Sequence, residues 1–235
     1  MKKKISYSAL IVILAIMMIG ILPAADRQTI AIAVKVIKDV SHKGDNTDWT
    51  KAKPGELLYS GDLVRTGDHS IAIVKFMDNS MLRVRESSEL KVFGEQKEGV
   101  FSKSVTVTRG DFSFDVQKQQ ENEKFTFSSP TSVAAIRGTE GEFGSTSTGD
   151  QLIVVDGLVN FLNSLSNQSV NVGTGQTGIS NTDGTIFVRE STPGEKSGAQ
   201  GALNNAHGQG TIKELDIQLQ NKQGGTETLQ IRYLD

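Results

Sequence analysis

The sequence contains no cysteine, and only one tryptophan and three histidines among its 235 residues. The absence of cysteine excludes a disulfide framework, a thiolate zinc site, a cysteine nucleophile and a lipid-modified cysteine. The histidines, His42, His69 and His207, are widely separated, and no Gly-x-Ser-x-Gly elbow occurs. We therefore expect no catalytic residues and no enzymatic activity.

The sequence also lacks an excess of charge of either sign. It has 25 Lys and Arg against 27 Asp and Glu, with a pI near 6.0. Nucleic-acid binding domains carry a basic excess, so we expect no nucleic-acid partner. Hydrophobic residues make up 37% and charged residues 22%. This is ordinary globular usage, and it predicts a domain with a real core.

The sequence has no calcium-binding loop of the Asp-x-Asp-x-Asp-Gly type. Asp62, Asp68 and Asp156 each lie beside a glycine, where aspartate typically accepts backbone hydrogen bonds in a turn. Glu140 and Glu142 alternate along one strand face, and a solvated sheet edge accounts for them better than a glycosidase pair. We therefore expect no bound metal ion and no cofactor.

The first 25 residues have the pattern of a secretory signal peptide. Lys2 to Lys4 form a basic start, Ala9 to Leu22 is uninterrupted by polar residues, and Pro23 to Ala25 ends the segment. An uncleaved N-terminal anchor is the alternative, since the segment is nearly long enough to span a membrane. In both cases the rest of the chain is exported to the periplasm or the exterior, with no other membrane contact.

Residues 26–190 show apolar residues at spacing two in short runs, with Gly, Asp and Asn between the runs. Ile30, Ile32, Val34 and Val36 form one such run. This is the strand pattern, and no helices of ten or more residues separate the runs. We predict an all-β domain of sandwich, barrel or short solenoid type.

The composition changes again near the C-terminus. Residues 191–210 are rich in Gly, Ser, Ala, Asn and Gln, and are predicted to form a flexible linker. Residues 211–235 regain strict alternation and are predicted to form a separate β-hairpin that docks on a partner or on the chain's own domain. The expected cross-strand pairs, all on one face, are Leu219 with Leu229, Ile217 with Ile231, and Leu215 with Tyr233.

Three motifs, in order, resemble the FecR domain family. The first is Leu57–Gly67 (LLYSGDLVRTG), the second is Phe125–Glu140 (FTFSSPTSVAAIRGTE), and the third is Val155–Val159 (VDGLV) with Gly175–Gln176. The resemblance implies an exported protein without enzymatic activity, with a β-solenoid or jelly-roll-like sandwich fold. It also implies a relationship to periplasmic sensors that relay receptor occupancy to a sigma factor. Only Met1–Lys4 precedes the apolar segment, so we expect the cytoplasmic anti-sigma part of such sensors to be missing.

The motif residues have structural explanations as well. Glycine at a corner permits a positive φ or a close backbone approach, and the neighbouring polar residues satisfy backbone groups there. The motif residues expected to hold the fold are Gly61, Asp62, Thr66, Gly67, Asp78, Pro130, Arg137, Gly138, Thr139, Asp156 and Gly157. The residues expected to dock a partner are Leu215, Ile217, Leu219, Leu229, Ile231 and Tyr233.

Two functional classes remain open. One is a protein-interaction or sensing module of the cell envelope, with a partner protein that the sequence does not name. The other is a cell-wall or polysaccharide-binding domain, for which Trp49 is the one candidate stacking platform. Trp49 also suits a lid over the edge of the core, which is the more common role of such a residue.

Overall fold

The computed structural model describes residues 28–45, 47–97, 100–121, 123–206, 212–220 and 226–234. The expected signal peptide, residues 1–25, lies outside this part of the chain. The described residues are mostly β, which confirms the predicted fold class, and they include one helix, α2 (Pro193–Ala206). No helix in these ranges is long and apolar enough to cross a membrane.

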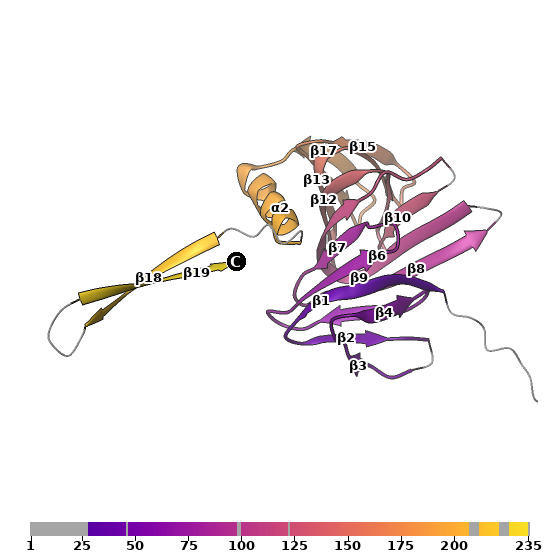
Figure 1. Ribbon diagram of the computed structural model, residues 1–235. Helices are drawn as coiled ribbons and strands as arrows, with labels where there is room; N and C mark the ends of the chain where they lie inside the picture. Colours follow the sequence, from indigo (N-terminus) through magenta and orange to yellow (C-terminus); the bar gives the residue numbers. More distant parts are fainter. Residues whose placement is uncertain are drawn as a thin grey trace, which may run out of the picture.

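Seventeen strands pair into one continuous sheet, which folds over on itself into two layers (Figure 1). They are β1 (Thr29–Ile37), β2 (Val40–Lys43), β3 (Thr50–Lys51), β4 (Glu56–Tyr59), β5 (Leu63–Thr66), β6 (Ile71–Phe76), β7 (Met81–Val84), β8 (Glu89–Lys97), β9 (Val100–Val116), β10 (Lys124–Ser128), β11 (Ser132–Ile136), β12 (Thr139–Thr146), β13 (Gly149–Asp156), β14 (Leu158–Asn163), β15 (Ser169–Gly173), β16 (Gln176–Asn181) and β17 (Ile186–Glu190).

We call the two layers sheet A and sheet B. Sheet A has the strand order β4-β1-β6-β7-β9-β12-β13-β16-β17. Sheet B has the order β3-β2-β5-β8-β9-β10-β11-β14-β15. Strand β9 belongs to both layers, and its parallel pairing with β10 differs from the antiparallel pairing of the other described strands.

Strand β9 changes layer at Gly110. The φ of this residue is 86°, and a Cβ atom there would lie 2.6 Å from the Cα atom of Ser88. A side chain therefore fits neither the backbone conformation nor the space. The glycine allows one long strand to join the two sheets.

The core lies between the two sheets and is built largely of phenylalanine. The ring centroids of neighbouring pairs lie 4.9 to 6.2 Å apart, mostly in edge-to-face geometry. Such pairs add specific geometry to the burial of a large apolar area. The fully buried rings are Phe76, Phe112, Phe114, Phe125, Phe127, Phe143 and Phe161.

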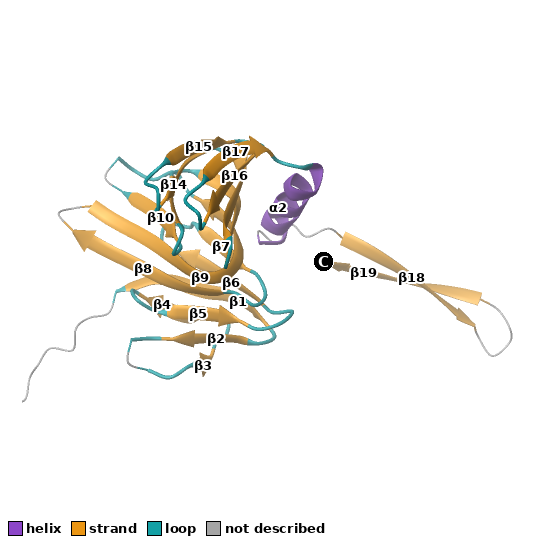
Figure 2. Cartoon of the chain, turned by 180° about the vertical axis from the view of Figure 1, so that it is seen from behind, coloured by secondary structure: helices purple, strands orange, loops and turns teal. Residues whose placement is uncertain are grey.

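The flexible linker expected at residues 191–210 is wrong, because residues 193–206 form helix α2. The helix begins with Thr192 as its N-cap and Pro193 in the first turn, where proline is tolerated. Ala199, Ala202 and Leu203 are buried, at the spacing of one helix face. Figure 2 shows that α2 starts beside β17 and runs across sheet A towards β7.

Residues 212–234 contain the expected hairpin, with strands β18 (Ile212–Gln220) and β19 (Thr226–Leu234). The predicted register is wrong by two residues. The structure pairs Leu215 with Ile231, Ile217 with Leu229, Leu219 with Glu227 and Lys213 with Tyr233. Alternation fixes which residues share a face, but a shift of two residues keeps the same faces, so the pattern alone could not select the register.

Candidate functional site

The first FecR-like motif builds two corners between the sheets. The carboxylate of Asp62 accepts a hydrogen bond from the Tyr59 N–H at 2.9 Å, and Gly61 has a φ of 95°. At the other corner the Thr66 hydroxyl accepts a hydrogen bond from the Ser88 N–H at 3.1 Å. Gly67 does not have a positive φ, but a Cβ there would lie 2.9 Å from the Oδ2 atom of Asp39. These residues hold the backbone of the fold.

The second and third motifs meet at one corner. Gly138 and Gly157 have φ values of 64° and 104°, and a Cβ on Gly157 would lie 2.9 Å from the Thr139 hydroxyl. Arg137 is exposed, and its Nε donates a hydrogen bond to the Gln119 carbonyl at 3.3 Å. Pro130 and Asp156 are exposed, in different turns. The motif residues therefore do not converge on one binding site.

Asp78 does more than initiate a turn. Its carboxylate forms an ion pair with Lys103, whose side chain is 1% exposed. It also accepts hydrogen bonds from Gln119 at 3.0 Å and from the Ser80 N–H at 3.1 Å. Burial alone would raise the pKa of Asp78, but the hydrogen bonds from Lys103, Gln119 and Ser80 outweigh it and lower the pKa. The pair joins the β6–β7 turn to the interior.

The sequence analysis missed Lys103. A signal was present, because Lys103 shares the alternation of Val105 and Val107, both of which are buried. In a strand this parity places the lysine on the inner face. Alternation along the strand shows which face Lys103 lies on, but it does not show which residue is its partner. Asp78 can be identified as the partner only when the strand order is known.

The outer face of sheet A carries helix α2 and a depression beside it. Helix α2 packs across β7, β9, β12 and β13, and beneath it the outward-facing Ser113 and Ile153 are 1% and 6% exposed. Beside α2 runs a depression with a floor of Gly144, Gln151 and Ile179. We call this depression the α2 groove. This first hollow measures about 290 Å³, and a second hollow of about 320 Å³ is lined by Arg85, which bonds to Glu142 of the first; we count both as sections of the groove.

Helix α2 is fixed at its start by a capping box. The Thr192 N–H donates to Glu195 Oε2 at 2.7 Å, and the Glu195 N–H donates to the Thr192 hydroxyl at 3.3 Å. Arg189 binds Glu195 with both terminal nitrogens, at 2.8 and 2.7 Å, and Gln151 donates to the same carboxylate at 2.6 Å. The hydrogen bonds from Arg189 are the main reason that the pKa of Glu195 is lowered to about 2.

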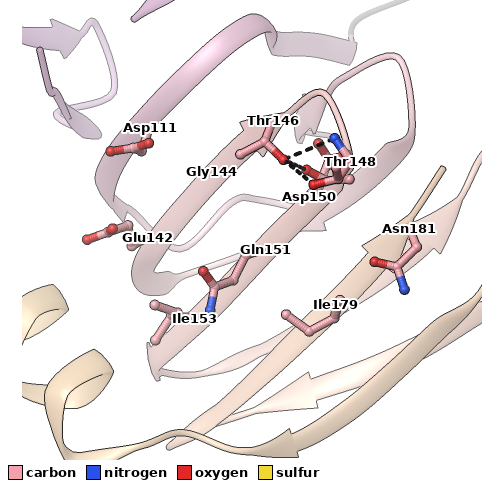
Figure 3. Close-up of a pocket in the computed structure, with 11 residues that line it drawn as sticks. Asp111, Glu142, Gly144, Thr146, Thr148, Asp150, Gln151, Ile153, Ile179 and Asn181 are labelled. Atoms are coloured by element: carbon pink, nitrogen blue, oxygen red, sulfur yellow. Dashed lines mark hydrogen bonds between the residues drawn. The ribbon is translucent and has the colours of Figure 1, made fainter. Parts of the chain in front are cut away.

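The first hollow of the groove is acidic. Figure 3 shows Asp111 and Glu142 close together on one side, with Gln151, Ile179 and Asn181 on the strands beyond. Glu142 receives a hydrogen bond from Arg85 at 3.0 Å, and Asp111 lies 3.5 Å from the same guanidinium. Arg85, which lines the second hollow, thus links it to the carboxylates of the first.

The second hollow is basic. It is lined by Arg83 and Arg85 with His69, Ser70, Ile71 and Glu86. Burial and the nearby charge of Arg85 lower the pKa of Arg83, and the charge of Glu142 offsets them in part. A half-buried guanidinium of this kind can receive a carboxylate or carbonyl from a bound chain.

The candidate docking residues of the C-terminus, among them Leu215 and Tyr233, lie in β18 and β19, which pair only with each other among the described strands. The structure describes the backbone of this hairpin. Trp49 is half-buried, and the guanidinium of Arg65 lies 4.1 Å from the centre of its ring. Within the described ranges, no group of three His, Asp or Glu side chains is placed to hold a metal ion.

A family model described as FecR protein matches residues 62–160. This match confirms the resemblance of the motifs to the FecR family. No curated protein matches the sequence.

Among solved structures, the chain is similar to a candidate anti-sigma factor from Parabacteroides distasonis ATCC 8503, with a TM-score of 0.50 and 12% identity. The match covers 59% of this chain and 64% of that chain. A second structure with the same description has a TM-score of 0.49 and 12% identity over the same shares of both chains, 59% and 64%. At this identity the likeness shows the fold alone.

Proposed function

We propose that this chain is an exported, non-catalytic sensing module of the cell envelope, and that its FecR domain binds a protein partner along the α2 groove. The family match supports a regulatory role, and the similar structure from Parabacteroides distasonis is described as a candidate anti-sigma factor. The groove is the single observation that provides a surface on which a protein partner can bind.

The groove suits a peptide chain better than a small ligand. It runs across strands from β6 to β16, so by the spacing of neighbouring strands it is about 24 Å long. Its acidic and basic sections, joined at Arg85, match a segment that carries both charges and backbone hydrogen-bonding groups. Small-molecule sites are more enclosed and more apolar than this.

A polysaccharide partner is the second candidate, and Trp49 argues against it. Sugar rings stack on a free aromatic face, whereas Arg65 covers one face of this half-buried ring. No other feature of the described residues favours the polysaccharide reading over a protein partner.

The substitution Gly144→Arg tests the groove directly. Gly144 does not have a positive φ, and a Cβ there would meet only Asp111 at 3.7 Å, so the fold should tolerate the change while the new side chain fills the floor. We expect retained melting temperature and at least tenfold weaker capture of the partner from envelope extracts. Thr108→Arg is the control, since Thr108 is exposed on the β9 segment of sheet B. Equal loss in both variants, or in neither, contradicts the proposal.

A further inference from the structure

Helix α2 has a sequence that forms a helix poorly on its own. Gly194, Gly198 and Gly201 lie within its 14 residues, and a Cβ atom on any of them would meet nothing within 4 Å. Close packing therefore does not require these glycines, and each makes the helix less stable than alanine would, because it loses more backbone freedom on folding. The last turn, residues 203–206, has no basic residue to offset the helix dipole. The helix depends on its contact with sheet A.

The contact between α2 and sheet A is small and imperfect. The helix buries two alanines and one leucine, Ala199, Ala202 and Leu203. Beneath it, the hydroxyl of Ser113 is buried and has no hydrogen-bond partner among the described residues. A buried hydroxyl without a partner costs free energy, and this cost disappears when the group reaches water. Lifting α2 from the sheet therefore hydrates Ser113 while giving up little apolar contact.

The strongest attachment of α2 lies at its first turn, where Arg189 and Gln151 bind Glu195. The rest of the helix lies on the outside of the domain, over the strands next to the groove (Figure 1). Ile153, which is 6% exposed beneath α2, also lines the first hollow of the groove. The surface of the α2 groove therefore continues under the helix.

We propose that α2 is a lid, which lifts from sheet A while the sandwich stays folded and uncovers Ile153 and Ser113 as a continuation of the α2 groove for the protein partner. Segments with few buried apolar contacts open at a lower free energy than the core around them. A partner that binds the open form shifts the lid towards that form. The role of the partner rests on the proposed function, whereas the motion of the lid can be tested on the chain alone.

The absence of cysteine from the chain allows the lid to be measured by thiol chemistry. Ser113→Cys, in the full chain, places one thiol beneath α2 and breaks no hydrogen bond of the serine hydroxyl. Val107→Cys is the control, since Val107 is 1% exposed in the core and becomes accessible only when the sandwich unfolds. With dithiobis(nitrobenzoate), we expect the thiol of Ser113→Cys to react at least tenfold faster than that of Val107→Cys.

Two further variants test whether α2 is what protects this thiol. Gly198→Ala with Gly201→Ala strengthens the helix, so it should slow the reaction of Ser113→Cys about tenfold. Glu195→Gln weakens the attachment of the first turn to Arg189, so it should speed the same reaction about tenfold. A reaction rate that neither variant changes would show that α2 does not gate the thiol, and would overturn the proposal.

Lys103→Met separates opening of the lid from unfolding of the sandwich. Because this substitution destabilises the domain through the loss of a buried ion pair, it should speed the reaction of Val107→Cys and leave that of Ser113→Cys unchanged. Equal rates at the two thiols, or a Ser113→Cys rate that rises together with that of Val107→Cys, would mean that α2 leaves only when the whole domain unfolds. Either result would overturn the lid.

Capture of the partner from envelope extracts tests the second half of the proposal. The double variant Gly198→Ala with Gly201→Ala should capture at least threefold less of the protein whose capture Gly144→Arg weakens. Unchanged capture would mean that the partner does not use the surface beneath α2. Because the thiol rates involve no partner, failure of the lid and failure of the proposed function give different results.

Discussion

At the scale of single residues, the polar groups inside the sandwich define the corners of the fold. Thr66 and Asp62 satisfy backbone N–H groups, and Asp78 holds the buried Lys103. Thr66, Asp62 and Asp78 were predicted as structural positions because turn residues form recognisable patterns within a short stretch of sequence. Lys103 was not predicted, because a lysine in a strand is usually solvated and its partner is 25 residues away.

The Asp78–Lys103 pair gives a prediction about stability. Lys103→Met removes the charge and leaves a largely buried carboxylate, so the free energy of unfolding should fall by about 3 kcal/mol at neutral pH. The double variant Lys103→Met with Asp78→Asn should recover most of that loss, because no unpaired charge remains. Urea unfolding of the chain, of the single variants Lys103→Met and Asp78→Asn, and of the double variant measures both effects. A double variant no better than Lys103→Met would mean that the pair is not coupled.

At the scale of secondary structure elements, the amino-acid composition of residues 191–210 led to a wrong prediction for helix α2. A Gly-rich and Ser-rich stretch suggests a linker, yet Thr192 and Glu195 form a capping box around Pro193, and that signal was readable. The anchoring of α2 to Arg189 and Gln151 depended on strand order and was not readable. The hairpin was predicted correctly as an element but not in its register, since five residues, 221–225, separate its strands.

The anchoring of α2 should depend on pH. The pKa of Glu195 falls from its ordinary value of 4.5 to about 2 in the folded chain. A lowered pKa stabilises the fold above pH 4.5, and this contribution is lost as the pH falls towards 2. The free energy difference between the chain and Glu195→Gln should therefore be largest above pH 4.5 and shrink towards zero near pH 2. A difference that stays constant over this range would show that the charge of Glu195 does not hold the helix.

At the scale of the whole molecule, the sequence predicted the all-β class and the FecR resemblance, because alternation and corner motifs are local patterns. The α2 groove could not be predicted. Its residues come from six strands and are ordinary in their local context, as the separation of Arg85 and Glu142 by 57 positions shows. Only the fold brings Arg85, Asp111 and Glu142 together on the outer face of sheet A.

The most direct test of the proposed function is cross-linking from a single cysteine in intact cells. Thr148→Cys places a thiol at the exposed rim of the groove, and Thr108→Cys places one on sheet B. With a thiol-reactive photo-cross-linker that does not cross the cytoplasmic membrane, we predict that both positions are labelled and that only Thr148→Cys gives an adduct with an envelope protein. Labelling that fails in intact cells would contradict export. Labelling without an adduct at Thr148→Cys, or with the same adduct at Thr108→Cys, would contradict the α2 groove as the partner-binding surface.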